Sequence, residues 1–282
     1  MKNVDEQLKA LLKNALNEDI GDGDHSTISC IPIEKKGKAI LKIKQKGILA
    51  GMNIAEMIFK LLEPNCTFTT YKSDGDNMQK GEVAFEINAS IHTILKGERV
   101  VLNCMQRMSG IATLTNTYVQ KLNGYRTKIL DTRKTTPNFR LLEKHAVAIG
   151  GATNHRFGLY DMIMLKDNDI DYCGGIEKAI NKAYDYVQSK KMDLKIEVET
   201  RSIDDVEKVM AVGKVNRIML DNFTPEKIVE ALQIIKGIYE TEASGGIQFD
   251  NLESYAATGV DYISSGAIIH QAKSLDLSLK AI

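Results

Sequence analysis

The sequence lacks an excess of charge of either sign. Lysine and arginine together number 37, and aspartate and glutamate together also number 37, so the formal net charge of the 282 residues is zero. A protein that binds nucleic acid or a membrane surface through general electrostatics usually carries a clear basic excess. The composition therefore argues against both kinds of partner.

Cysteine is scarce, and long apolar runs are absent. The four cysteines, Cys30, Cys66, Cys104 and Cys173, are far apart and form no C-x-x-C pair, which indicates free thiols in a reducing compartment. No stretch resembles a signal peptide or a membrane span. With 43% hydrophobic and 26% charged residues, the chain has the composition of a globular protein, and we expect it to be cytoplasmic.

Common motifs of nucleotide binding and hydrolysis are missing as well. The sequence has no P-loop, no G-x-G-x-x-G after a strand, no G-x-S-x-G and no H-E-x-x-H. Residues 18–27 alternate acids and glycines like a calcium loop. Twelve residues counted from Asp19 or Asp22, however, end at Cys30 or Ile33 instead of the required glutamate. We predict a turn-rich surface loop there.

Hydrophobic spacing in the first hundred residues predicts a mixed α and β region. Apolar residues recur at helical spacing over 4–17 and 54–62, and the segments 38–49, 66–72 and 82–94 have the character of strands. We expect mostly antiparallel strands in this region.

From Gly97 to about Leu122 the apolar residues follow helical spacing. Arg99 would lie at the start of this helix, where a cation opposes the helix dipole. Local sequence alone favours a solvated surface arginine, although another group could hold it.

After Gly124 short apolar strands alternate with helical segments, which predicts parallel strands joined by crossover helices. The predicted strands are 128–130, 162–165, 194–198, 217–220, 238–241 and 262–263, and the predicted helices are 141–148, 176–189, 203–212, 225–235 and 251–258. Polar residues follow every strand, as in a β/α barrel whose site is built from the loops after its strands. An open doubly wound sheet usually gathers ligand groups at one switch point. We therefore predict an incomplete, open β/α barrel of about six or seven parallel strands.

Basic residues are concentrated after the first two of these strands and in the connection between them. They are Arg133, Lys134, His155, Arg156 and Lys166. Guanidinium groups bind carboxylate or phosphate in two-point contacts, and ammonium groups act as point charges. In a protein of zero net charge, this cluster predicts a ligand with several negative charges. Lys166 could be a Schiff-base lysine or could simply neutralise charge.

Two glycine-containing segments follow the last two strands, namely Ser244-Gly245-Gly246 and Ser265-Gly266-Ala267. Barrels often hold a phosphate at this place with backbone N–H groups, because glycine permits close approach. The two segments together predict a phosphate site. His270 follows closely, but a lone histidine is more often structural, and it stays outside the predicted site.

Glu199 and Asp221 end two neighbouring strands. Two carboxylates beside a phosphate site suggest Mg²⁺, which binds few protein carboxylates together with substrate phosphate oxygens. Glu197 lies on the same side of its strand as Glu199, and Glu199 is nearer the loop and so the better ligand. Asn168 and Asn222 could orient these groups.

Several motifs, taken in order, resemble those of the quinolinate phosphoribosyltransferase family, also called nicotinate-nucleotide pyrophosphorylase (carboxylating). They are Asp131-Thr-Arg-Lys-Thr135, Gly150-Gly-Ala-Thr-Asn-His-Arg156, Lys166-Asp-Asn168, Glu197-Val-Glu199, Leu220-Asp-Asn222 and Ser244-Gly-Gly246. The resemblance covers nearly the whole chain. It implies an N-terminal α/β sandwich domain (1–108, with the tail 271–282 packed on it) and a β/α barrel catalytic domain (109–270).

The resemblance also implies a reaction. Quinolinate and phosphoribosyl pyrophosphate would give nicotinate mononucleotide, pyrophosphate and CO₂ with Mg²⁺, a step of de novo NAD biosynthesis. It implies a homodimer in which Arg99 reaches the partner's site, and it leaves open whether dimers assemble into hexamers. It also leaves open whether Glu199 and Asp221 bind Mg²⁺ directly or through water and substrate.

The resemblance assigns roles residue by residue. Lys134, Lys166, Glu199 and Asp221 would be catalytic, with Glu199 and Asp221 near the ribose hydroxyls and Mg²⁺. The substrate-binding residues implied near quinolinate are Arg99, Arg133, His155, Arg156 and Lys166. Lys134 would lie near the diphosphate or ribose, Thr132 would also contact substrate, and Ser244–Gly246 with Ser265–Ala267 would hold the 5′-phosphate.

Other functions remain open at this point. A sugar-phosphate aldolase or isomerase would use Lys166 as a Schiff base, and borohydride trapping would detect it. A molybdenum-gene-associated relative shares much of the barrel, but the full basic set argues against it. A phosphate-sensing module without turnover would leave the basic cluster unexplained.

Overall fold

The computed structural model describes residues 4–282, which fall into two compact units. The first contains the described residues up to 116 together with 135–151 and 268–282, and the second contains 117–134 and 152–267. Both ends of the chain thus belong to the first unit. Among the described residues, no helix has the length and apolar character needed to cross a membrane.

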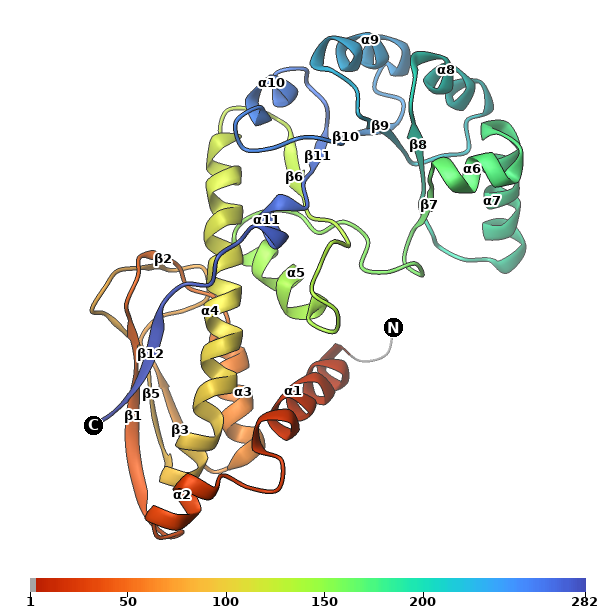
Figure 1. Cartoon of the computed structure of the whole chain (residues 1–282). Coiled ribbons are helices and arrows are strands. Elements are labelled where there is room, and N and C mark those ends of the chain that lie inside the picture. The colour runs from red at the N-terminus through yellow and green to blue at the C-terminus, as the bar shows by residue number, and fades with distance from the viewer. Residues whose placement is uncertain (1–3) are drawn as a thin grey trace. The chain divides into compact units, whose positions relative to one another are not determined.

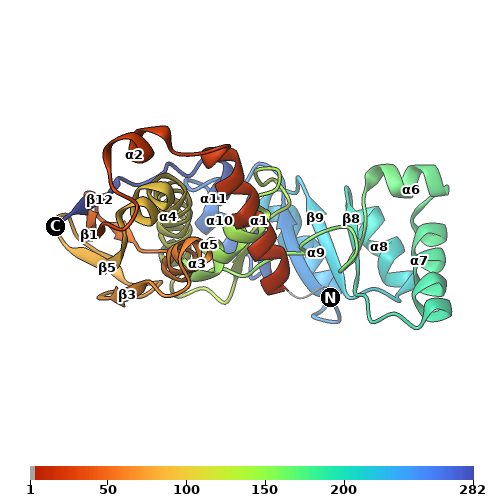
Figure 2. The same cartoon turned by 90° about the horizontal axis from the view of Figure 1, so that it is seen from below.

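The first unit is built on a four-stranded antiparallel sheet in the order β12-β1-β5-β3 (Figure 1). Its strands are β1 (Lys36–Ile43), β3 (Thr67–Thr70), β5 (Val83–Ser90) and β12 (Leu277–Ala281), and a separate pair joins β2 (Gly47–Ile48) to β4 (Asn77–Met78). Its helices are α1 (Val4–Ile20), α2 (His25–Cys30), α3 (Met52–Leu62), most of α4 (Ile91–Lys121) and α5 (Arg140–Ile149). Figure 2 shows α3 and α4 on the same side of the sheet.

Apolar alternation explains how this sheet buries one face. On β1 the side chains of Ala39, Leu41 and Ile43 are buried, and the residues between them are at least partly exposed. Phe59 of α3 packs against this face, with its ring 6.2 Å from the ring of Phe85 in an edge-to-face arrangement. The core of the first unit is therefore an ordinary apolar layer between sheet and helices.

Two local predictions in the first unit are wrong. Strand β5 ends at Ser90 and α4 begins at Ile91, because the apolar run that starts at Ile91 fits helical as well as strand spacing. Arg99 consequently lies in the third turn of α4, exposed, and not at the helix start. Part of the predicted surface loop forms α2, since the Asp24 side chain accepts the Thr27 N–H at 3.1 Å as an N-cap.

The second unit contains one parallel sheet of six strands in the order β6-β11-β10-β9-β8-β7. The strands are β6 (Lys128–Leu130), β7 (Ile163–Leu165), β8 (Ile196–Thr200), β9 (Arg217–Asp221), β10 (Glu240–Ser244) and β11 (Tyr262–Ser264). The helices of this unit are α6 (Asp167–Cys173), α7 (Ile176–Lys190), α8 (Ile203–Val212), α9 (Pro225–Ile235) and α10 (Leu252–Ala256). The short α11 (Ala267–His270) follows, and all of it except Ala267 belongs to the first unit.

The parallel sheet curves with its helices outside, as Figure 1 shows for α7, α8, α9 and α10. β6 and β7 lie at opposite edges of the sheet, so the barrel is open between them. This confirms the predicted incomplete β/α barrel. Because all six strands run in the same direction, the residues after their carboxyl ends meet at one end of the sheet.

Candidate active site

A cavity of about 670 Å³ opens at the carboxyl ends of the strands in the second unit. The predicted site residues on its wall are Thr132, Arg133, Lys134, His155, Arg156, Lys166, Glu199, Asp221, Ser244 and Gly245. Gly246, Ser265, Gly266 and Ala267 are not part of this wall, and Arg99 belongs to the first unit. The fold thus brings most of the predicted basic and acidic residues into one cavity.

The loop after β6 is shaped by Asp131, whose side chain is fully buried. Its carboxylate accepts the backbone N–H of His155 at 2.7 Å and the Asn154 side-chain amide at 2.8 Å. Next to it, the Thr132 hydroxyl accepts the N–H of Lys134 at 3.0 Å. Asp131 therefore fastens segment 154–156, which comes from a distant part of the sequence, to the end of β6.

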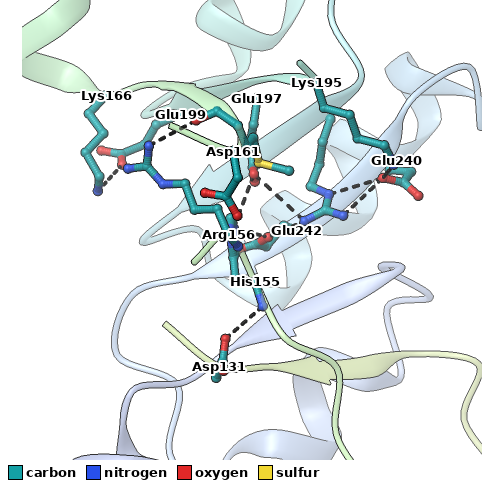
Figure 3. A network of polar contacts seen from close by, with 12 residues as sticks. Asp131, His155, Arg156, Asp161, Lys166, Lys195, Glu197, Glu199, Glu240 and Glu242 are labelled. Atoms are coloured by element: carbon teal, nitrogen blue, oxygen red, sulfur yellow. Dashed lines mark hydrogen bonds and ion pairs between the residues drawn. The ribbon is translucent and has the colours of Figure 1, made fainter. Parts of the chain in front are cut away.

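His155 is engaged at both ring nitrogens (Figure 3). Its Nε2 lies 3.2 Å from Glu197 and 3.2 Å from Glu242, both fully buried, and its Nδ1 accepts the N–H of Arg156 at 2.6 Å. The two carboxylates raise the pKa of His155 against the effect of burial, whereas the Arg156 N–H at Nδ1 opposes a second proton on the ring. A cationic ring would need a proton on Nδ1, where the Arg156 N–H already donates. The geometry therefore favours a neutral ring with its proton on Nε2.

Arg156 and Arg133 bring two positive charges to one side of the cavity. The Arg156 guanidinium donates to the carbonyl of Met162 at 3.3 Å. The pKa of Arg156 is lowered mainly by burial and secondly by the nearby positive charge of Arg133. The negative charge of Glu197 raises it. Two guanidinium groups that disfavour each other's charge at a cavity wall form a place where an anion would relieve the repulsion.

Lys166 extends from the end of β7 across the cavity wall toward β8. Its ammonium lies 3.2 Å from a carboxylate oxygen of Glu199, and its backbone N–H donates to Asp169 at 3.0 Å (Figure 3). The Lys166 side chain is half exposed, whereas that of Glu199 is nearly buried. This pairing favours charge neutralisation over the Schiff-base alternative, because a nucleophilic lysine must present an unpaired amine.

Asp221, Asn222 and Gly245 form a tightly packed corner where β9 and β10 end. Asn222 has a positive φ of 57°, its amide donates to Asp221 at 2.5 Å, and its backbone N–H donates to the carbonyl of Ser244 at 2.8 Å. A Cβ atom at Gly245 would come within 2.2 Å of the Asn222 side-chain oxygen. Only glycine fits there, and Gly245 leaves the backbone of the loop accessible from the cavity.

The two carboxylates proposed for Mg²⁺ both lie on the cavity wall. Within residues 4–282, the only group of three or more metal-ligating side chains close enough to share an ion is the deeper set His155, Glu197 and Glu242. Glu199 and Asp221 by themselves would fill only part of a coordination shell. Their oxygen chemistry suits Mg²⁺, which commonly completes its shell with substrate phosphate oxygens and water.

Sequence reasoning missed the charged floor of this cavity. Arg217 lies 3.1 Å from Glu242 and 3.8 Å from Glu197. Figure 3 shows Glu197 and Glu242 close to His155. Burial and the charge of Glu242 raise the pKa of Glu197 to about 7, whereas the hydrogen bond from His155 keeps the pKa of Glu242 low despite its burial. The sequence did contain a signal for them. Glu197 lies two residues before Glu199 and Glu242 lies two residues before Ser244, and residues two apart on a strand point to the same side of the sheet.

One phosphate prediction shifts by a residue. Ser264, not Ser265, lies on the cavity wall. The backbone N–H of Ser265 donates to Leu130 at 3.0 Å, so it is used in joining β11 to β6. The available signal for Ser264 was its place directly after the predicted strand 262–263.

Comparison with known proteins assigns the chain to a family. Residues 24–109 match the quinolinate phosphoribosyl transferase N-terminal domain, and residues 111–280 match the corresponding C-terminal domain. The chain is 43% identical over 288 residues to quinolinate phosphoribosyltransferase [decarboxylating] 1b from Nicotiana tabacum, covering 97% of this chain and 82% of that protein.

Solved structures agree with the sequence comparison. NadC from Streptococcus pyogenes superimposes with a TM-score of 0.91 at 41% identity, covering 98% of this chain and 97% of that one. The nicotinate-nucleotide pyrophosphorylase from Francisella tularensis superimposes with a TM-score of 0.90 at 37% identity, covering 98% and 96%. With both domains matched and relatives of this identity over nearly the full chain, the protein belongs to the quinolinate phosphoribosyl transferase family of enzymes.

Proposed function

We propose that the protein transfers the phosphoribosyl group of phosphoribosyl pyrophosphate to quinolinate with loss of CO₂, giving nicotinate mononucleotide in NAD biosynthesis. The observation that carries the proposal is the cavity of the second unit, in which four basic side chains face two carboxylates. These are Arg133, Lys134, Arg156 and Lys166, opposite Glu199 and Asp221. A dicarboxylate and a diphosphate ester are ligands that match such a distribution of charge.

In this proposal the two guanidinium groups bind the quinolinate carboxylates, with Lys166 beside them. Arg133 and Arg156 are near enough for the charge of one to disfavour the charge of the other, and a bound dicarboxylate would remove that repulsion. His155 supports this part of the wall. Both of its ring nitrogens already contact other protein groups. We therefore propose that His155 supports Arg156 and does not itself bind quinolinate.

The phosphoribosyl donor would occupy the side of the cavity formed by β9 and β10. Ser244 and Gly245, with Gly246 next to them, would hold the 5′-phosphate through backbone N–H groups, because Gly245 leaves the backbone accessible. Lys134 and Thr132 would lie at the diphosphate or ribose. Ser265, Gly266 and Ala267 would act from the neighbouring loop, with Ser264 between them and the cavity.

The overall reaction makes two bonds and breaks two. The pyridine nitrogen attacks ribose C1, the C1–O bond to pyrophosphate breaks, and its electron pair leaves with pyrophosphate. The cationic ring nitrogen then accepts the electrons of the bond to the 2-carboxylate. CO₂ departs, and a proton replaces it on the ring. No protein base is needed for the first step, since no proton leaves the attacking nitrogen.

The chain's own residues act on the charges that develop. The carboxylates of Glu199 and Asp221 would stabilise positive charge at the ribose, and Lys134 and Lys166 would stabilise the departing pyrophosphate. Mg²⁺ bound through Glu199 and Asp221 would supply further neutralisation of phosphate charge. Holding both substrates in line can supply roughly 7–11 kcal/mol in favourable cases.

We also propose a cytoplasmic homodimer in which Arg99 completes the site of the partner. The exposed position of Arg99 in the third turn of α4 supports its availability to a second copy. Mixing an Arg99→Ala protein with a protein inactivated at Lys166 would restore activity in hybrid dimers if the arginine acts across the interface. An absence of restored activity in demonstrated hybrids would refute the shared site.

The test of the whole proposal is a coupled assay with Mg²⁺, quinolinate and phosphoribosyl pyrophosphate that measures nicotinate mononucleotide and CO₂. We expect turnover with quinolinate, none with nicotinate, and loss of turnover when a chelator removes the metal. Folded protein that shows no turnover with quinolinate would refute the proposed reaction.

A further inference from the structure

A group of charged side chains lies at the base of the cavity, on the inner side of the parallel sheet, and two of its members, His155 and Glu242, form part of the cavity wall. Glu197 of β8, Arg217 of β9 and Glu242 of β10 are all buried, and together with His155 we call them the floor cluster. Barrel interiors are commonly filled by bulky apolar side chains. Burying four polar groups costs free energy unless they are matched, so their contacts deserve an explanation in terms of function.

We propose that Glu197 and Glu242 are positioning residues, which fix the rotamer and tautomer of His155 and through it the backbone N–H and guanidinium of Arg156. The identity of the ligand bound by Arg156 rests on the proposed function, but the positioning itself does not. Neither carboxylate needs to touch substrate for this role.

The contacts form a continuous path from the floor to the cavity wall. Two carboxylate oxygens lie 3.2 Å from Nε2 of His155, and a proton on this nitrogen turns their repulsion of its lone pair into attraction. Nδ1 is then unprotonated and accepts the N–H of Arg156 at 2.6 Å. Asp131 holds the His155 backbone from the other side at 2.7 Å. The imidazole cannot rotate without losing contacts at both nitrogens.

The cluster also acts on Arg156 through charge. With His155 neutral and Glu197 ionised, as it is above about pH 7, the carboxylates of Glu197 and Glu242 and the guanidinium of Arg217 leave one negative charge in excess. The charge of Glu197 favours the cationic form of Arg156, against the effects of burial and of Arg133. The negative charge of the floor cluster thus offsets the repulsion between Arg133 and Arg156 while no ligand is bound.

The same charge count argues against a metal ion in the floor cluster. His155, Glu197 and Glu242 have ligand atoms close enough to enclose an ion. Arg217, however, already lies 3.1 Å from Glu242, and a divalent ion beside it would leave a net positive charge in a buried place. A proton on Nε2 lets both carboxylates contact the ring at 3.2 Å without that cost.

The first measurement uses the unaltered protein. Nitrogen-15 NMR of the histidine rings at pH 7.5, about one unit from the ordinary histidine pKa, should show His155 protonated on Nε2 and unprotonated on Nδ1. The signal is assigned by its loss in His155→Gln. A proton on Nδ1, alone or together with one on Nε2, would overturn the proposal, because Nδ1 could then not accept from Arg156. Loss of the Nε2 proton on adding Zn²⁺ would also overturn it in favour of a metal site.

The second measurement compares Glu242→Gln with Glu240→Gln. Glu240 is the matched control, since it lies on the same strand and pairs with Arg217 at 3.1 Å from the opposite side without contacting His155. We expect Glu242→Gln to raise the KM for quinolinate by about tenfold, to change kcat and the KM for phosphoribosyl pyrophosphate by less than about threefold, and to alter the His155 tautomer.

The control should leave these values and the tautomer unchanged. Equal effects of the two substitutions, or a Glu242→Gln protein with wild-type tautomer and wild-type KM, would overturn the proposal. If the wild-type enzyme does not turn over quinolinate, the proposed function fails, and the tautomer result still decides the positioning role.

Discussion

The two larger sheets of the described residues differ in whether they bury charged side chains. The antiparallel sheet of the first unit buries apolar residues such as Leu41 and Phe85, whereas the parallel sheet of the second unit buries Glu197, Arg217 and Glu242 on its inner side. Apolar burial stabilises a fold directly. Buried ion pairs contribute little net stability, because desolvation offsets their attraction. The first sheet is therefore built for stability, and the second accepts a cost in stability to hold a charged site in place.

The largest expected effect is on stability in the first unit. Phe85→Ala removes an aromatic side chain in ring contact with Phe59 and Phe68, and should lower the free energy of unfolding by about 4 kcal/mol. Urea unfolding followed by circular dichroism measures the loss. Tyr71→Ala, at a 56% exposed aromatic of the same unit, is the control and should change stability by less than about 0.5 kcal/mol. Similar losses for both would contradict the contrast between the sheets.

Removing the buried cation of the second unit should have the next largest effect. Arg217→Ala leaves Glu197 and Glu242 without their guanidinium partner and should cost about 3 kcal/mol of stability. Combining it with Glu242→Gln removes one of the unmatched charges, so the double variant should recover part of the loss in the same urea titration. Strictly additive losses would mean that the charge is not the cause.

A substitution in the cavity should affect substrate use and leave stability largely unchanged. Arg133→Ala should raise the KM for quinolinate by about 100-fold, close to 2.7 kcal/mol, and change the KM for phosphoribosyl pyrophosphate by less than about threefold. Steady-state kinetics with each substrate varied in turn measures the difference. Arg201→Ala is the control, because this exposed arginine pairs with Asp171 and lies outside the cavity. Equal changes in both KM values would refute the role of Arg133 in binding quinolinate.

The smallest expected effect is a dependence of stability on pH. The pKa of Glu197 is raised to about 7, above its ordinary value of 4.5, so the folded protein binds a proton there that the unfolded chain releases. This contribution to stability is fully present below pH 4.5 and is lost as the pH rises through 7. Between pH 5 and pH 8 it should remove about 2 kcal/mol. Urea titrations across this range should show a shallower slope for Glu197→Gln, and an unchanged slope would contradict the assignment.

Sequence reasoning located helices best where local chemistry marks both ends. The helices α8 and α9 begin and end where they were predicted, because Ser202 and Thr224 cap their first turns and Pro225 opens α9. The start of α4 was misplaced, since apolar spacing there fits two structures equally well. The short α6, α11 and β12 were not predicted as separate elements, because each is defined by tertiary contacts more than by its own sequence.

The site was predicted from position more than from residue type. Polar residues after parallel strands must gather at one end of a sheet, so Arg133, Lys166, Glu199 and Asp221 could be grouped before any coordinates existed. Glu197 and Glu242 were missed as a pair because charged residues within a strand are usually assigned to solvent. Their burial depends on which face the sheet turns inward and on His155 arriving from another segment, and neither follows from local sequence.

The pairing of β12 with β1 has a consequence for how the protein is made. Leu277–Ala281 supplies the edge strand beside Lys36–Ile43, with Leu41 opposite Leu279. A ribosome therefore releases every residue of the parallel sheet before the antiparallel sheet can gain its fourth strand. The nascent chain carries β1 with an unpaired edge through most of translation, and such an edge can pair with a neighbouring chain. Chaperones that cover this edge until synthesis ends would prevent such pairing when the protein is produced quickly.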